Sequence, residues 1–209
     1  MRKDLQLEWR QRFAINGLLL YILCTVLAAY MSFGHPQPLV WLAVFWIILL
    51  FASVNAVAKS FMQESPARQL YYYTVFSPQA VILSKIFYNI LLLLLLALLG
   101  LFAYTLLLGN PVKDWGLFLA SVILGAVGFS MCFTLVSGIA AKAAKNATLM
   151  PILSLPLIVP ILAMLISVSK TAVTGISNSN SAKDVAILLA IDGIMGVLSL
   201  VLFPYLWKD

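Results

Sequence analysis

Six apolar stretches, each long enough to cross about 30 Å of hydrocarbon, divide this chain of 209 residues. In lipid every backbone polar group needs a partner within the protein, so such stretches fold as α-helices. The chain is 63% hydrophobic and 10% charged, with a mean hydropathy of +1.05, which is more apolar surface than a soluble domain of this size could bury. We therefore predict an all-α membrane protein with a single domain over residues 1–209. Its six transmembrane helices should lie near 14–33, 39–58, 81–108, 116–141, 148–168 and 185–207.

The distribution of Lys and Arg orients these spans, because cytoplasmic loops of membrane proteins carry an excess of positive charge. If the chain starts in the cytoplasm, the basic residues on the outer side are only Lys113, Lys170 and Lys183. The cytoplasmic side then carries Arg2, Lys3, Arg10, Arg12, Lys59, Arg68, Lys85, Lys142, Lys145 and Lys208. We expect both chain ends to be cytoplasmic. The net charge of +6 belongs at the membrane surface and does not indicate nucleic-acid binding.

Before the first span, large apolar residues recur every four positions. Leu5, Trp9 and Phe13 alternate with charged and polar residues. This pattern is typical of a short helix that lies in the headgroup plane, here over residues 1–13. An ordinary positively charged flank is the alternative.

The connection 59–80 is the most informative polar segment. Glu64 and Arg68 are four residues apart, with Pro66 between them, and aromatic residues stand at 61, 71, 72, 73 and 76. Large apolar groups rimmed by charge often mark a surface for a partner protein. We expect a docking loop on the cytoplasmic side; an aromatic belt on the lipid headgroups is the alternative.

The fifth span carries prolines at 151, 156 and 160. A proline inside a helix removes a backbone hydrogen bond and costs roughly 3 kcal/mol. A plain anchor has no use for such breaks, and in a membrane they persist where neighbouring groups satisfy the freed carbonyls. Ser154 lies one turn from two of them and is a candidate for this role. Pro151 can simply start the helix, so we assign bending or gating to Pro156 and Pro160.

Asp192 lies inside the sixth span. An ionisable group in hydrocarbon costs at least about 2.5 kcal/mol, which marks it as a candidate intramembrane polar site. In the alternative, it lies near the outer headgroups and pairs with a hydroxyl group or with Lys183. Interhelical hydrogen bonds are the simplest role for Asn89 and the other amide and phenol groups within the spans.

Enzyme and metal chemistry have little support. The one histidine, His35, lies in a short outer loop, where a solvated residue and a haem or metal ligand are both conceivable. Cys24 and Cys132 stand inside apolar runs and are expected to be small buried residues. There is no phosphate-binding loop that would hold ATP, and no nucleophile stands beside a base. We predict a non-catalytic chain with no catalytic or metal-ligating residues.

Five short motifs follow one another along the chain: residues 5–10 (LQLEWR), 61–64 (FMQE), Ser77-Pro78, Ser84-Lys85 and, above all, 153–161 (LSLPLIVPI). In these motifs the chain resembles haem exporter protein B, the CcmB family of membrane subunits in cytochrome c maturation, within the wider group of ABC-2-type permeases. The resemblance covers essentially the whole chain.

The resemblance implies a bacterial inner-membrane subunit that couples ATP hydrolysis by a cytoplasmic partner to haem export, or to release of a haem-loaded chaperone. It implies two copies of this chain and a haem-handling membrane subunit, with haem as transported or partner-held ligand and no cofactor bound by this chain. The 59–80 loop would dock the ATP-binding subunit. Its coupling residues would be Phe61, Glu64, Arg68, Gln69 and Lys85.

Three other functions remain as alternatives, one of which is an inert scaffold for other maturation proteins. An ABC-2 permease for a lipid or a drug-like molecule would have the same fold. A secondary transporter would use Asp192 as its coupling group.

Overall fold

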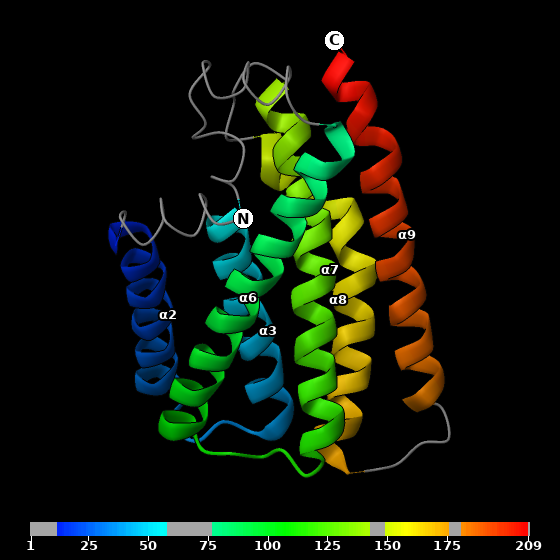
Figure 1. Cartoon of the computed structure of the whole chain (residues 1–209). Helices are drawn as coiled ribbons and strands as arrows, with labels where there is room; N and C mark the ends of the chain where they lie inside the picture. Colours follow the sequence, from blue (N-terminus) through cyan, green and yellow to red (C-terminus); the bar gives the residue numbers. More distant parts are fainter. Residues whose placement is uncertain (1–11, 58–76, 143–148, 176–180, 209) are drawn as a thin grey trace.

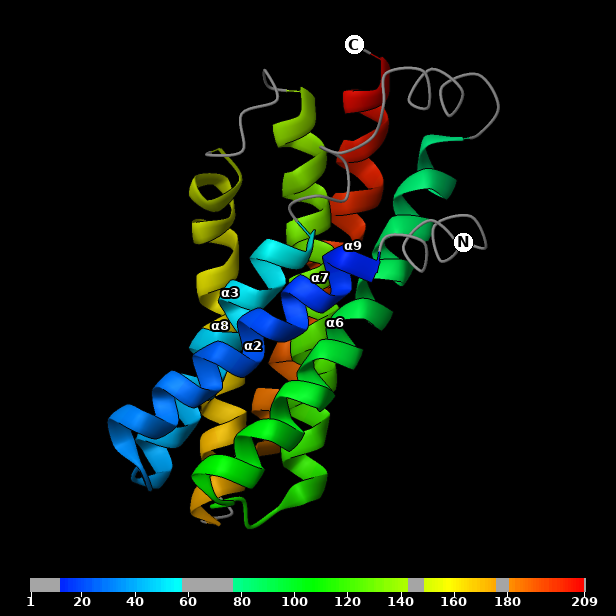
Figure 2. The same ribbon diagram turned by 90° about the vertical axis from the view of Figure 1, so that its left-hand side faces the viewer.

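The computed structural model describes residues 12–57, 77–142, 149–175 and 181–208. These residues form six helices that run alternately up and down (Figures 1 and 2). The helices are α2 (Arg12–Phe33), α3 (Pro38–Val57), α6 (Pro78–Leu108), α7 (Trp115–Lys142), α8 (Leu149–Thr174) and α9 (Ser181–Lys208). All six are long and apolar enough to cross a membrane, which confirms the predicted all-α, six-span fold.

The predicted interfacial helix at 1–13 and most of the 59–80 loop lie outside the described residues. We call the end of the bundle with the connections 34–37 and 109–114 the outer end, following the predicted orientation. The start of α2 and the end of α9 both point to the opposite, inner end (Figure 1).

Several predicted helix ends were wrong. The third helix begins at Pro78 instead of 81, because Ser77 caps it: the Ala80 N–H donates to Ser77 Oγ at 3.4 Å, and Pro78 occupies the first turn. The fifth helix continues to Thr174 instead of 168, and the sixth begins at Ser181 instead of 185. The long outer connection predicted at 169–184 is therefore largely helical.

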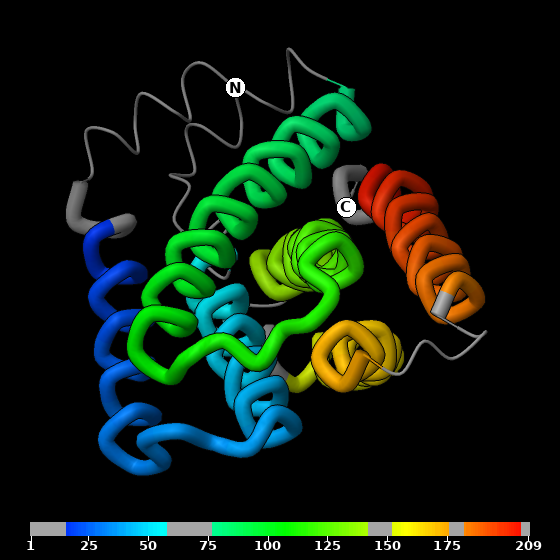
Figure 3. Tube along the Cα trace, turned by 90° about the horizontal axis from the view of Figure 1, so that it is seen from below, coloured from blue at the N-terminus to red at the C-terminus, as the bar shows by residue number. Residues whose placement is uncertain are grey.

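Helix α7 is the centre of the bundle. Figure 3 shows it enclosed by α3, α6, α8 and α9, with α2 at the periphery. Within its apolar span 67% of the residues are buried, against 17% for α2. Small residues on α7, among them Ser121 and Gly125 four residues apart, permit this close approach. Cys132 on α7 is buried as expected, whereas Cys24 is exposed because it lies on the peripheral helix α2.

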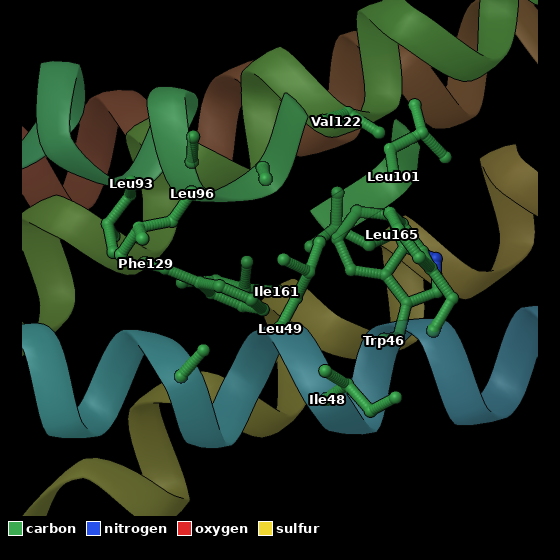
Figure 4. Packing of buried hydrophobic residues seen from close by; sticks show 14 of the residues in the cluster. Trp46, Ile48, Leu49, Leu93, Leu96, Leu101, Val122, Phe129, Ile161 and Leu165 are labelled. Carbon is green, nitrogen blue, oxygen red and sulfur yellow. The ribbon is translucent and has the colours of Figure 1, made fainter. Parts of the chain in front are cut away.

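The core is built around the Trp46 side chain of α3. Figure 4 shows residues of α3, α6, α7 and α8 meeting there. The indole ring has its centroid 5.5 Å from that of Phe45 and 6.3 Å from that of Phe129. It lies directly over Gly125 of α7: a Cβ atom at position 125 would be 2.9 Å from Trp46 Cζ3 and 3.2 Å from Leu165 Cδ1. The lack of a side chain at Gly125 therefore lets the indole ring pack directly against the backbone of α7.

We predict that Gly125→Ala lowers the stability of the bundle. The added methyl group would overpack the indole ring, which has neighbours on every side, at a cost of about 1–3 kcal/mol. A lower Tm in detergent would report this. Gly193→Ala on α9 is the matched control, since a Cβ atom there meets nothing within 4 Å. Equal Tm values for the two variants would contradict the prediction.

Candidate functional site

Helix α8 is continuous from Leu149 to Thr174 with Pro156 and Pro160 inside it, and Pro151 lies in its first turn. Both internal prolines are exposed, so their rings point away from the bundle. The carbonyl groups that lose their helix donor belong to residues 152 and 156, which are also exposed. Ser154 is buried on the opposite side of α8. Its predicted role as a partner of these carbonyl groups stays a prediction.

The two parts of α8 on either side of Pro160 are packed very differently. On the inner side, Ile152, Leu155 and Val159 are 58–60% exposed, and among residues 152–159 only Ser154 and Ile158 are buried. On the outer side, the buried face is fully enclosed, with no exposure at Ile161, Leu165, Val168, Ser169 and Ala172. Figure 2 shows the inner part of α8 (yellow) standing away from α7. The prolines thus mark the boundary between an anchored part and a loosely packed part.

A buried hydrogen-bond cluster fixes the outer part of α8 to α3 and α7. The Trp46 Nε1–H donates to Ser169 Oγ at 3.1 Å, and Ser169 Oγ lies 3.0 Å from Ser121 Oγ. All three side chains are at most 1% exposed. This anchor joins residues far apart in sequence and was not predicted.

The outer end of α8 has a second attachment. The backbone N–H groups of Lys113 and Asp114 donate to the Ala172 carbonyl oxygen at 3.1 and 3.0 Å, and Lys113 Nζ donates to the Thr174 carbonyl at 2.9 Å. A cation at a helix C-terminus is favourable, and Gly175, with φ of +71°, ends the helix. These contacts explain why α8 extends six residues beyond its predicted end.

Asp192 lies at the junction of three helices. The residue is 4% exposed, and its Oδ1 atom lies against the Gly128 position of α7, which Ile161 of α8 also borders. Gly128 is the middle of α7, and Ile161 follows Pro160 directly. Neither Asp192 oxygen has a hydrogen-bond partner among the described residues. The alternative of a pair with a hydroxyl group or with Lys183 near the outer headgroups is therefore wrong: Lys183 is exposed at the start of α9.

The other predicted polar residues have simpler surroundings. Asn89 Nδ2 on α6 donates to Thr134 Oγ1 on α7 at 2.8 Å, which confirms an interhelical hydrogen bond. His35 is exposed in the outer connection 34–37. Within the described ranges no three His, Cys, Asp or Glu side chains gather as a metal site.

Of the five predicted coupling residues, the structure describes one, Lys85. Lys85 is half-buried near the inner start of α6. Phe61, Glu64, Arg68 and Gln69 lie outside the described residues.

Comparison with protein families identifies the chain. The family model described as CcmB protein matches residues 1–206. The chain belongs to the CcmB family. It is thus a multi-pass membrane component of haem export for cytochrome c maturation, of the permease type, as the sequence predicted. Comparison with curated proteins gave no match.

Proposed function

We propose that this CcmB-family chain is the membrane subunit of an ATP-driven complex in the bacterial inner membrane. It couples ATP hydrolysis by a separate cytoplasmic subunit to haem export, or to release of a haem-loaded chaperone. Two copies of the chain pair with two ATP-binding subunits, and a haem-handling membrane subunit completes the complex. Family membership supports the ATP-binding partner and haem as the cargo.

The observation that carries the coupling mechanism is the division of α8. Its outer part is attached through Ser169 and Ala172, and its inner part begins on the side where an ATP-binding subunit would dock. A force applied there would move the inner part about Pro156 and Pro160, because proline removes the hydrogen bonds that stiffen a helix. Hinges of this kind convert docking outside the membrane into rearrangement within it.

Co-purification tests the proposal. The tagged chain, extracted in mild detergent, should recover an ATP-binding subunit and a haem-handling membrane protein. Recovery of neither under conditions that keep the chain folded would reject the complex.

We predict that Glu64→Lys or Arg68→Glu uncouples the complex. In our proposal these residues carry the charged contact with the ATP-binding subunit, and losing one partner of such a contact typically costs about 2 kcal/mol or more. Mature c-type cytochromes, measured by haem staining of membranes, should fall more than about tenfold while the chain remains inserted.

A charge reversal on the outer side serves as the control for these two variants. Lys170 is exposed at the outer part of α8. Lys170→Glu should therefore leave cytochrome levels unchanged. Normal cytochrome levels in both loop variants would defeat the assignment of the coupling loop.

A further inference from the structure

Asp192 differs from the other acidic residues that the structure describes. Asp114 Oδ1 accepts a hydrogen bond from the Leu117 N–H at 3.0 Å, and Asp184 Oδ2 accepts one from Ser167 Oγ at 2.7 Å. Both lie near helix starts at the outer end. Asp192 alone among the three is buried, and neither of its oxygens has a partner in the described parts of the chain.

Among the described residues, no hydrogen-bond donor stabilises the ionised form of Asp192. A carboxylate accepts hydrogen bonds only, and an unpaired buried charge costs several kcal/mol. The protonated form has an O–H donor and needs only a carbonyl acceptor. The buried Ser199 of the same helix makes a hydrogen bond of this kind, since its Oγ donates to the Met195 carbonyl one turn earlier at 2.8 Å. A protonated Asp192 has the Leu188 carbonyl at the same spacing.

No ionisable side chain described on the neighbouring helices pairs with Asp192 in a way that would stabilise its ionised form. Helix α9 packs against α6, α7 and α8. The titratable side chains described on these four helices are Lys85, Tyr88, Tyr104, Cys132, Lys170, Lys183, Asp184 and Tyr205, besides Asp192. None of them hydrogen-bonds to Asp192. Cys132 lies one turn beyond Gly128 on the same face of α7 and is a weak donor at best.

We propose that Asp192 is a proton-binding site within the membrane, which holds its proton while α9 packs against α7 and α8 at the Gly128 position. The site adjoins Pro160. Separation of α8 from α9 would admit water to the carboxyl group and permit proton release, so the two events are thermodynamically linked. The assignment is independent of the proposed ATP coupling.

Infrared spectroscopy of the purified chain in lipid nanodiscs at neutral pH tests this proposal. The spectrum should contain the carbonyl band of a protonated carboxylic acid. Asp192→Asn, which is nearly isosteric, should abolish the band, whereas the matched variant Asp184→Asn should keep it. Absence of the band in the unmodified chain, or its persistence in Asp192→Asn, would overturn the proposal.

A second pair of variants tests the location of the site. A Cβ atom at position 128 would collide with Asp192 Oδ1, so Gly128→Ala must displace the carboxyl group and shift or weaken the band. Gly193→Ala, next to Asp192 but with nothing within 4 Å of its Cβ position, should leave the band unchanged. An unchanged band in a folded Gly128→Ala protein would contradict the assigned packing.

Discussion

Replacing both internal prolines of α8 should stiffen the helix and stop cytochrome c maturation. Each Pro→Ala change restores a backbone hydrogen bond and removes a clash, worth roughly 3 kcal/mol in a helix interior. In the Pro156→Ala/Pro160→Ala double variant, a straight α8 would therefore resist bending. We expect insertion and partner binding to be retained, with mature c-type cytochromes reduced more than about tenfold.

The placement of these prolines makes the experiment informative. Both are exposed, so the substitution removes no packing from the core of the bundle. Val159 lies between them on the same exposed side, at 58% exposure, and Val159→Ala is the control that changes this surface without restoring a backbone hydrogen bond. Unaltered cytochrome levels in the double variant would show that cytochrome c maturation does not require α8 to bend at these prolines.

The span prediction succeeded because length and apolarity decide which segments cross a membrane. Where a helix ends depends on contacts that one sequence does not reveal. The Lys113 side chain and the 109–114 connection cap α8, and thereby extend it to Thr174 beyond its most apolar part. The family was also predictable from short motifs such as residues 153–161, and the match of the family model over residues 1–206 confirms it.

The candidate site was predictable by residue type but not by environment. The sequence identifies Pro156, Pro160 and Asp192 as unusual in a membrane, since each carries a known cost. It does not reveal that the prolines point outward, or that Asp192 lies level with the middle of α7. Both facts depend on helix rotation and tilt, which are set by packing against neighbouring helices. The anchor of α8 pairs Trp46 with a serine 123 residues away, a contact with no local signal.

Removing that anchor should destabilise the bundle more than Gly125→Ala does. Trp46 is 1% exposed, and truncating a buried aromatic side chain to alanine typically costs about 3–5 kcal/mol. Trp46→Ala would also leave Ser169 without its indole donor. We expect a correspondingly lower free energy of unfolding, measured by titration with a denaturing detergent in mixed micelles.

Two matched variants separate the contributions of the indole ring. Trp46→Phe keeps most of the packing but loses the N–H donor, so its cost should be nearer to about 1 kcal/mol. Trp115→Ala removes an indole that is 39% exposed at the outer start of α7, and should cost less than Trp46→Ala. If Trp46→Ala were no more destabilising than Trp115→Ala, the outer part of α8 would not be anchored through Trp46. Bending about Pro156 and Pro160 would then lack the fixed end that a hinge requires.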